Sequence, residues 1–340
     1  MNITQKHYSF CAYRLPGADV VRLRRGVTRK GFHPGFVIAP FDMSGNVYTI
    51  SDTEETSWSE ISNILHTADF GVAEYPFPEV STSKVEHADE VAGIKNFISG
   101  NHDKKVIASR IILKNDSIDI KCSFLNLERA YPQAFVFLFF SPETGGWIGA
   151  SPELLLESSN SELSTYALAG TRPAGTNAAW DEKNLKEQRI VCNYIVDVFK
   201  SNGLTPICSE IETKEAGNVE HLLNKISASR QSTTDINKLL INLSPTPALS
   251  GYPKEEAMKL ISEIERQPRG FYGGFIGPYD NDEDFTFFVN LRSIRFTDRG
   301  YYMQVGGGIT ALSNPDDEWM ETENKSLSIL RKLILSGDKQ

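Results

Sequence analysis

The sequence has few cysteines and no long apolar run, and these absences narrow what the protein can be. Its four cysteines lie far apart and form no CxxC pair, so we expect neither a zinc knuckle nor a dense disulfide framework. Residues 1–17 lack a basic stretch followed by an apolar segment, and no apolar stretch approaches the length of a transmembrane helix. We therefore expect a soluble, cytoplasmic protein without a signal peptide or a membrane partner.

Positive charge is also in the minority. The chain has 35 Lys and Arg against 44 Asp and Glu, which gives a net charge of -9. It therefore lacks the excess of positive charge that is typical of nucleic-acid-binding proteins. It contains no HExxH and no GxSxG, and its glycine clusters are not spaced as GxGxxG or GxxxxGK[ST]. The clusters at residues 273–277 and 306–308 fit either turns and bulges or a close approach of the backbone to a small anionic ligand.

What the chain does have is enough apolar sequence for a large core. Of its 340 residues 40% are hydrophobic, and we find no internal repeat or linker, so we expect one domain over residues 1–340. Runs of strands interspersed with runs of helices predict an α+β fold with largely antiparallel sheets. The predicted strands are 105–113, 134–142, 145–158, 164–170, 269–280, 284–296 and 300–310, and the predicted helices are 83–100, 180–203 and 314–334.

Two charged residues break the apolar pattern of their elements. Lys105 begins a strand whose alternation places apolar residues on both faces, so the strand is predicted to be buried on both sides. On the helix 180–203, Glu187 falls in line with an apolar stripe that contains Val191 and Val198. A carboxylate inside that stripe must be protonated, paired or bound to a cation, although periodicity alone favours a position where the stripe leaves the core.

Three further sites admit two interpretations each. Glu153 follows Pro152 in a leucine-rich strand. It is either a neutral carboxyl suited to general acid catalysis or a carboxylate in water at the edge of the strand. Arg292, in another apolar strand, suits bidentate binding of a carboxylate or a structural ion pair. On the last helix Glu318, Glu321 and Lys325 share one face. That face is either solvated, with a Glu–Lys pair, or it contributes carboxylates to a divalent cation such as Mg²⁺.

A series of short stretches, taken in order, resembles the chorismate-utilising enzymes, which include the anthranilate, aminodeoxychorismate, isochorismate and salicylate synthases. The stretches are KVIASR, GASPELLL, ALAGTRPAG, DEKNLKEQRIV, VEHL, PTPALSGYP, RGFYGGFIG, NLRSIRF, QVGGGIT and DEWMETENK. They run from about residue 104 to 331, whereas residues 1–85 are less typical. The resemblance implies one α+β domain in which two large antiparallel sheets pack together with helices outside.

Within this family, the resemblance favours water addition over amination. Lys105 stands where the isochorismate and salicylate synthases carry the base that activates water, and the ammonia-adding enzymes carry glutamine there. Ala169 stands where aminodeoxychorismate synthases have a nucleophilic lysine. The implied chemistry is deprotonation by Lys105 of a water that attacks C2 of chorismate, while Glu153 protonates the departing C4 hydroxyl.

The resemblance also implies a metal and a binding pocket. Mg²⁺ would be held by Glu187 and Glu321, with Glu318 acting through water, and would bind the ring carboxylate of chorismate. Arg292 and Tyr272 would meet the enolpyruvyl carboxylate. The implied pocket is completed by the backbone of Gly170, Thr171 and Gly306 and by the side chains of His221 and Lys325.

Three positions depart from the family's pattern. Ser244 and Gln188 stand where many relatives have histidine, and Asn184 stands where an acidic residue is common, which leaves substrate fine-tuning and the outer metal shell open. The sequence as a whole predicts an isochorismate synthase, an isomerase, that acts as a monomer. Its product would feed menaquinone, a siderophore or salicylate. The alternatives are a salicylate synthase, an anthranilate synthase component I, and a catalytically inactive chorismate-binding module.

Overall fold

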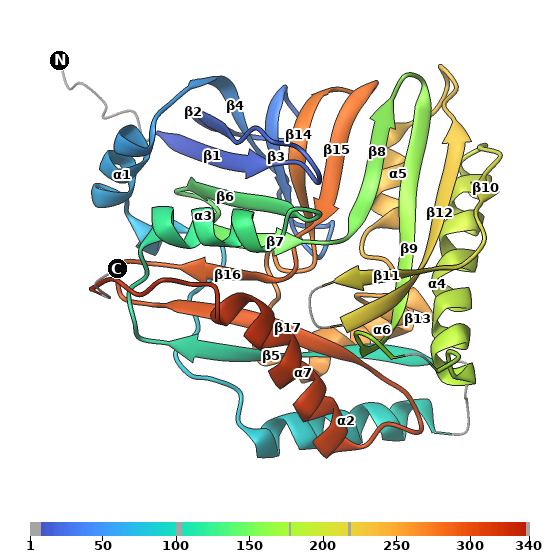
Figure 1. The fold of residues 1–340 in the computed structure, drawn as a ribbon. Helices are drawn as coiled ribbons and strands as arrows, with labels where there is room; N and C mark the ends of the chain where they lie inside the picture. The colour runs from blue at the N-terminus through green and yellow to red at the C-terminus, as the bar shows by residue number, and fades with distance from the viewer. Residues whose placement is uncertain (1–7, 100–103, 177, 217–218, 338–340) are drawn as a thin grey trace.

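The computed structural model describes residues 8–99, 104–176, 178–216 and 219–337 (Figure 1). The strands are β1 Ser9–Arg14, β2 Arg22–Lys30, β3 Gly35–Ala39, β4 Tyr48–Glu55, β5 Lys105–Lys114, β6 Phe135–Ser141, β7 Gly145–Ser151, β8 Leu154–Ser159, β9 Glu162–Pro173, β10 Ile207–Cys208, β11 Glu212–Ala216, β12 Val219–Ser229, β13 Gly251–Tyr252, β14 Phe275–Asn281, β15 Asp284–Val289, β16 Ser293–Phe296 and β17 Tyr301–Ile309. The helices are α1 Trp58–His66, α2 Lys84–Ile98, α3 Ile120–Ala130, α4 Glu182–Ser201, α5 Ile236–Leu243, α6 Lys254–Ile264 and α7 Pro315–Leu330, with a short 3₁₀ turn at Phe70–Val72.

The described strands form one hydrogen-bonded sheet, so the α+β prediction is confirmed and the expectation of two separate sheets is wrong. Every pairing between named strands is antiparallel, in the order β13, β5, β17, β16, β7, β6, β1, β2, β4, β3, β14, β15, β8, β9 and β12, with β10 and β11 both against β12. Pairs such as Phe10 with Phe140 join strands that are distant in sequence. These long-range pairings make the two expected sheets continuous.

The sheet curls so that strands far apart in its order face each other. Phe135 on β6 and Phe288 on β15 stack with ring centroids 4.3 Å apart, although several strands separate β6 from β15 in the sheet. Phe36 on β3 joins the same aromatic layer. The layer excludes water between the facing strands and so holds the curved sheet closed.

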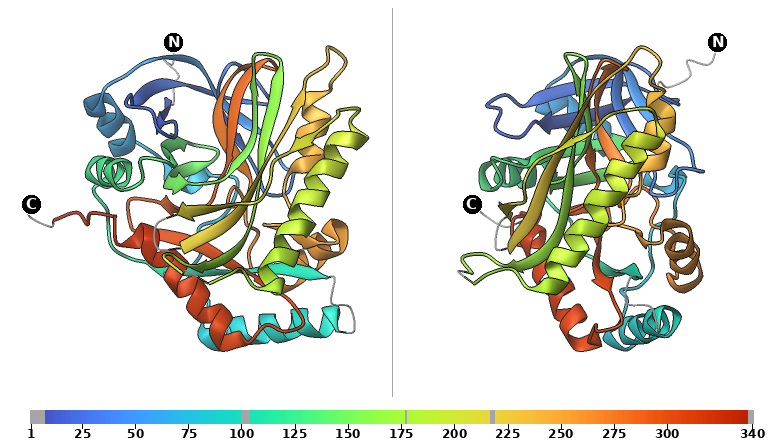
Figure 2. Two further views of the ribbon diagram at one scale, coloured as in Figure 1. Left: turned by 45° about the vertical axis from the view of Figure 1, so that its right-hand side comes forward. Right: turned by 90° about the vertical axis from the view of Figure 1, so that its right-hand side faces the viewer.

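Helices cover the outer surfaces of this sheet, as expected (Figure 2). Helix α4 packs on β9 and β12, while α7 packs on β17 and on α2. Val191 and Val198 of the predicted apolar stripe of α4 are buried, and Gln188 is buried with them. Glu187 is half-buried, which fits a position where the stripe leaves the core. The sequence offers Asn314 or Asp316 as the cap of α7, and the cap is Asn314. The glycine at position 100 predicts the end of α2, and it lies outside the described residues.

Strand β5 brings Lys105 into the middle of the structure. It lies between β17 and β13 and is buried on both faces over its first seven residues, as its alternation predicted. Among the described residues, no helix is long and apolar enough to cross a membrane.

Candidate active site

One cavity is lined by all but one of the predicted site residues, which come from strands, loops and helices far apart in the chain. The residues on its wall are Lys105, Glu153, Gly170, Thr171, Glu187, His221, Tyr272, Arg292, Gly306, Glu321 and Lys325. Glu318 is the exception, and it lies behind Gly307, which lines the cavity. The fold therefore gathers the residues that the sequence singled out, while their roles stay predictions.

Lys105 is only 7% exposed, and its ammonium is held by a carboxylate. Its Nζ lies 3.1 Å from Oε2 of Glu187, on the first half of α4. Gly308 of β17 packs directly against this side chain, since a Cβ there would lie 2.2 Å from Cε of Lys105. One glycine of the 306–308 cluster thus serves to make room for the lysine, which is neither of the two interpretations that the sequence suggested.

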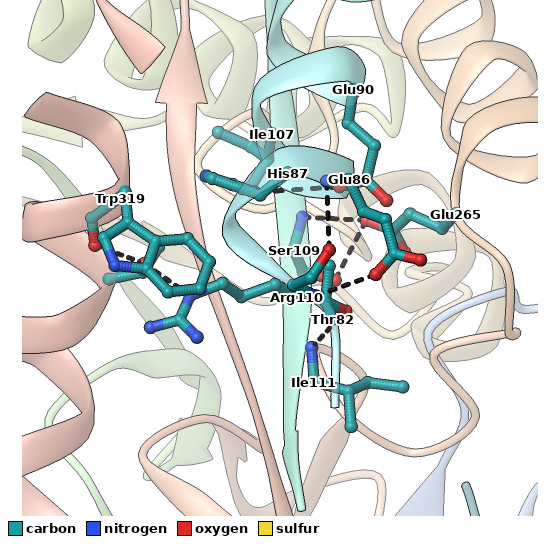
Figure 3. A network of polar contacts seen from close by, with 12 residues as sticks. Thr82, Glu86, His87, Glu90, Ile107, Ser109, Arg110, Ile111, Glu265 and Trp319 are labelled. Carbon is teal, nitrogen blue, oxygen red and sulfur yellow. Dashed lines mark hydrogen bonds and ion pairs between the residues drawn. The ribbon is translucent and has the colours of Figure 1, made fainter. Parts of the chain in front are cut away.

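Glu265 and Arg269, which sequence reasoning missed, fix the first half of β5; Figure 3 shows Glu265 beside Ser109 of this strand. The backbone N–H and the hydroxyl of Ser109 both donate to Oε1 of Glu265, each at 2.9 Å. Arg269 pairs with Glu265 at 2.6 Å and donates from Nη2 to the carbonyl oxygen of Ile107 at 2.8 Å. This buried pair therefore anchors the strand just beyond Lys105. An Arg and a Glu four residues apart gave no signal in the sequence beyond a helical ion pair.

A second set of contacts holds α7 in place (Figure 3). The guanidinium of Arg110, on β5, lies 3.8 Å from the ring centroid of Trp319, and its Nε donates to the hydroxyl of Thr322 at 2.7 Å. Arg110 also pairs with Glu323. From α2, the ring of His87 lies 5.8 Å from the Trp319 ring. These contacts set the position of the helix that carries the predicted metal ligands.

Glu153 lies between β7 and β8 in surroundings that favour the neutral acid. Burial raises the pKa of its carboxyl to about 7, and the ammonium of Lys214 opposes this rise. Lys214, on β11, donates to the carbonyl oxygen of Pro152 at 3.3 Å, and burial lowers the pKa of Lys214. Of the two interpretations of Glu153, these surroundings favour the neutral carboxyl over a strand-edge carboxylate in water. Lys214 was missed because one lysine in a polar, alternating strand carries no signal.

The glycine-containing wall of the cavity is built around a neutral histidine. Burial lowers the pKa of His221 to about 4, so the ring is uncharged near neutral pH. Its Nδ1 lies 2.9 Å from the carbonyl oxygen of Gly170 and 3.1 Å from Oγ1 of Thr171. Because the carbonyl can only accept, Nδ1 carries the proton and Nε2 is left as an acceptor. Gly170 has a φ of +70°, the left-handed conformation that glycine adopts without strain.

Two of the departures from the family's pattern have structural roles here. Oδ1 of Asn184 accepts the backbone N–H of Thr171 at 2.9 Å and so orients the cavity wall. Gln188 is buried, and its Nε2 donates to the carbonyl oxygen of Ala167 and to Oδ1 of Asn224, which ties α4 to β9 and β12. An acidic residue at position 184 would still accept the Thr171 N–H but would lose the bond that Nδ2 of Asn184 donates to Asp181 at 2.9 Å.

Arg292 lies on the cavity wall beside Tyr272. Its backbone has a φ of +52°, which is uncommon outside glycine and is typical of functional positions. Nη1 donates to Oγ of Ser328 at 2.8 Å, and burial lowers the pKa of the guanidinium. Burial also raises the pKa of Tyr272 to about 12. In the part of the chain that the structure describes, no carboxylate forms an ion pair with Arg292, so its charge is available to an anionic ligand.

The two carboxylates of α7 fit a hard divalent cation. Oε2 of Glu318 is buried without a hydrogen-bond partner, and burial raises the pKa of that carboxyl. A Cβ at Gly307 would lie 3.1 Å from this oxygen and 3.5 Å from Oε1 of Glu321, so the glycine leaves space between the pair and the cavity. Glu321 accepts from Lys325 at 2.6 Å, and the pKa of Glu321 is lowered by that ammonium.

Glu187, which the resemblance makes a direct ligand together with Glu321, pairs with Lys105 in this structure. Within the described ranges, no three His, Cys, Asp or Glu side chains are grouped to hold a metal ion. The residues present therefore fit a cation at Glu318 and Glu321 that completes its shell with other ligands, as Mg²⁺ commonly does.

Comparison with known proteins finds relatives of this chain. A family profile described as "Chorismate binding enzyme" matches residues 51–334. Anthranilate synthase component 1 of Pseudomonas putida is 27% identical over 273 residues, which cover 75% of this chain and 54% of that protein. The isochorismate synthase of Bacillus subtilis is 32% identical over 241 residues, covering 66% and 50%. The chain thus spans about half the length of these two curated relatives.

A solved structure shows the same fold. The menaquinone-specific isochorismate synthase from Escherichia coli superimposes with a TM-score of 0.77 at 19% identity, covering 97% of this chain and 89% of that one.

Proposed function

Since the chain belongs to the family of chorismate-binding enzymes, we propose that it is an isochorismate synthase, which adds water at C2 of chorismate and removes the C4 hydroxyl. The observation that carries the proposal is that Lys105 and Glu153 line the same cavity, an amine and a carboxyl whose pKa is raised to about 7. Ala169, on the same wall, offers no nucleophile of the kind that aminodeoxychorismate synthases carry there.

In this proposal Glu153 is the general acid. A carboxyl with a pKa of about 7 is still substantially protonated near neutral pH, so it can donate its proton to the C4 oxygen, which leaves as water. Lys105 is the general base, and its neutral form takes a proton from the water that attacks C2. This role requires the contact with Glu187, 3.1 Å away, to be broken, so that Nζ is free to accept the proton of the attacking water.

The remaining wall residues suit a dianionic substrate. The unpaired guanidinium of Arg292 would bind the enolpyruvyl carboxylate, with the Tyr272 hydroxyl beside it. Nε2 of His221 can accept a substrate hydroxyl, because its neutral ring has its proton on Nδ1. A divalent cation on Glu321 and Glu318, with Glu187 as a third ligand, would supply charge for the ring carboxylate and compete with Lys105 for Glu187.

Two other activities of the family are the alternatives, and each would use this same cavity. A salicylate synthase would use the same residues and then eliminate pyruvate. Amination is favoured by one observation, the similarity to anthranilate synthases over three quarters of the chain. Against it, the resemblance assigns to Lys105 the position of a water-activating base. A monomeric, cytoplasmic, single-domain enzyme remains our prediction.

The test is a proton NMR time course of the purified protein with chorismate and Mg²⁺ in the absence of ammonia. Accumulation of isochorismate to an equilibrium mixture with chorismate is the expected result. Salicylate together with equimolar pyruvate would instead identify a salicylate synthase. Unchanged chorismate would contradict the proposal, and adding ammonium to the same tube then separates an anthranilate synthase from an inactive binding module.

A further inference from the structure

A pair of thiols lies outside the lining of the cavity, and one of them is on α4, five residues after Glu187. Sγ of Cys192, on α4, is 3.2 Å from Sγ of Cys208, on β10, and Cys208 lies sixteen residues later in the chain. The sulfurs of a disulfide are about 2.05 Å apart, so the two sulfurs need to approach each other by only about 1 Å for the bond to form. We propose that Cys192 and Cys208 form a reversible thiol–disulfide site that cross-links α4 to the sheet.

The two thiols differ in a way that sets the order of reaction. Cys208 is exposed, whereas Cys192 is half-buried and packs against the core. Burial raises the pKa of Cys192 to about 12, with further contributions from Cys208. A soluble oxidant therefore meets Cys208 first, and Cys192 is positioned to attack the oxidised sulfur rather than the oxidant.

The reaction balances with a peroxide as the two-electron oxidant. The Cys208 thiolate attacks hydrogen peroxide, forms a sulfenic acid and releases hydroxide. Cys192, as it loses its proton, attacks the Cys208 sulfur and expels a second hydroxide as the disulfide forms. Two thiols and one peroxide thus give one disulfide and two waters, and a dithiol reductant reverses the change.

The other cysteines do not share this arrangement. Cys11 is buried in β1, and Cys122 is half-buried on α3. Over the described part of the chain, no second pair of sulfurs lies in contact. Selective cross-linking is therefore expected at one place, and Cys122 serves as an internal control for general thiol oxidation.

The cross-link would join parts of the molecule that both reach the cavity. Cys192 lies on the helix that carries Glu187, and β10 pairs with β12, which carries His221, through Cys208 and Ile226. The disulfide would close a short loop and restrict the unfolded chain, so oxidation should raise the thermal midpoint by on the order of a few degrees. This consequence does not depend on the proposed reaction.

The test treats the reduced full-length protein with one equivalent of hydrogen peroxide, then alkylates free thiols and measures intact and peptide masses. We expect a loss of two hydrogen atoms, a peptide pair joined through Cys192 and Cys208, reversal by dithiothreitol, and a higher thermal midpoint. A sulfenic acid that persists at Cys208 without a cross-link, or disulfide-linked dimers in place of the internal cross-link, would overturn the proposal.

Matched variants make the assignment specific. Cys192→Ser should abolish the cross-link and the thermal shift and leave Cys208 as a sulfenic acid, the product of one equivalent of peroxide, while Cys122→Ser should retain the cross-link and the thermal shift. Equal thermal shifts in wild type and Cys192→Ser would show that the stabilisation does not come from this pair, and would contradict the proposal even where the peptide is found.

Discussion

Gly308 leaves the space that Lys105 occupies, since any side chain at 308 would begin 2.2 Å from Cε and 2.8 Å from Nζ of the lysine. The two residues lie on adjacent strands, where Gly308 is registered opposite Ile107. Strand backbones in this register cannot separate without breaking the β5–β17 ladder, so the lysine would have to move instead. The position of the predicted base is thus set by a glycine more than 200 residues away in the chain.

Replacing Gly308 with alanine should displace Lys105 and lower kcat by about 100-fold, because a misplacement of about 1 Å at a reacting group can cost that much. The measurement is steady-state turnover of chorismate, with circular dichroism to show that the fold persists. Gly93→Ala is the control, since a Cβ at this helical position meets nothing within 4 Å. A Gly308→Ala enzyme with normal turnover would show that the position of Lys105 does not limit the reaction.

Removing the amine itself should be more severe. Lys105→Ala should lower kcat by roughly 100- to 10,000-fold, the range expected for loss of a general acid or base. The matched control is the preceding residue, because Lys104→Ala removes a partly exposed ion pair with Glu256 and should leave turnover unchanged. Full activity in Lys105→Ala would remove this residue from the base role.

The pH dependence should report the protonation of Glu153. Burial raises the pKa of Glu153 to about 7, so the acid form is present below that pH and is lost as the pH rises through about 7. We expect kcat/KM to fall over that interval. Lys214→Met should move this fall to higher pH, because the Lys214 ammonium lowers the pKa of Glu153.

The control for that shift is Lys259→Met, which removes an exposed lysine of α6 and should leave the profile in place. If the fall in kcat/KM moved to lower pH in Lys214→Met, or moved equally in both variants, the pH profile would not report the protonation of Glu153.

Metal binding should depend on the two carboxylates of α7. Mg²⁺ should raise the thermal midpoint of the wild-type protein by mass action, and Glu321→Gln should weaken its affinity by at least about tenfold. Glu318→Gln should also weaken binding, because its buried, unpartnered oxygen would no longer be charged. Thermal unfolding with increasing Mg²⁺ measures this without catalysis, and Asp317→Asn is the exposed control on the same helix. Identical Mg²⁺ responses in all four proteins would rule out the site.

The Arg269–Glu265 pair should matter for stability as well as for the position of β5. Arg269→Leu leaves a buried carboxylate without its partner and should cost about 3–5 kcal/mol of unfolding free energy, measured by urea denaturation. Arg266→Ala removes an exposed ion pair with Glu86 and should stay within about 0.5 kcal/mol. Equal losses in the two variants would mean that burial of the Arg269 pair contributes little.

The sequence by itself determined the local elements and the residues of interest. Alternation predicted that the strand beginning at Lys105 is buried on both faces, and a cap at Asn314 or Asp316 predicted the start of α7, which Asn314 caps. Both signals could be read because periodicity and capping depend on neighbours in the chain. Motifs in a fixed order indicated the family, which the profile match confirmed. They also named the residues that line the cavity, with Glu318 as the exception.

Tertiary structure alone decided how those pieces meet. One sheet replaced two because hydrogen bonds form between strands such as β1 and β6, which no local pattern links. The room that Gly308 makes for Lys105, the Arg269–Glu265 anchor on β5, and the effect of Lys214 on Glu153 all join residues that are distant in sequence. Burial, steric exclusion and charge act through space, so a linear pattern can name a reactive residue but cannot say which neighbours set its position and protonation.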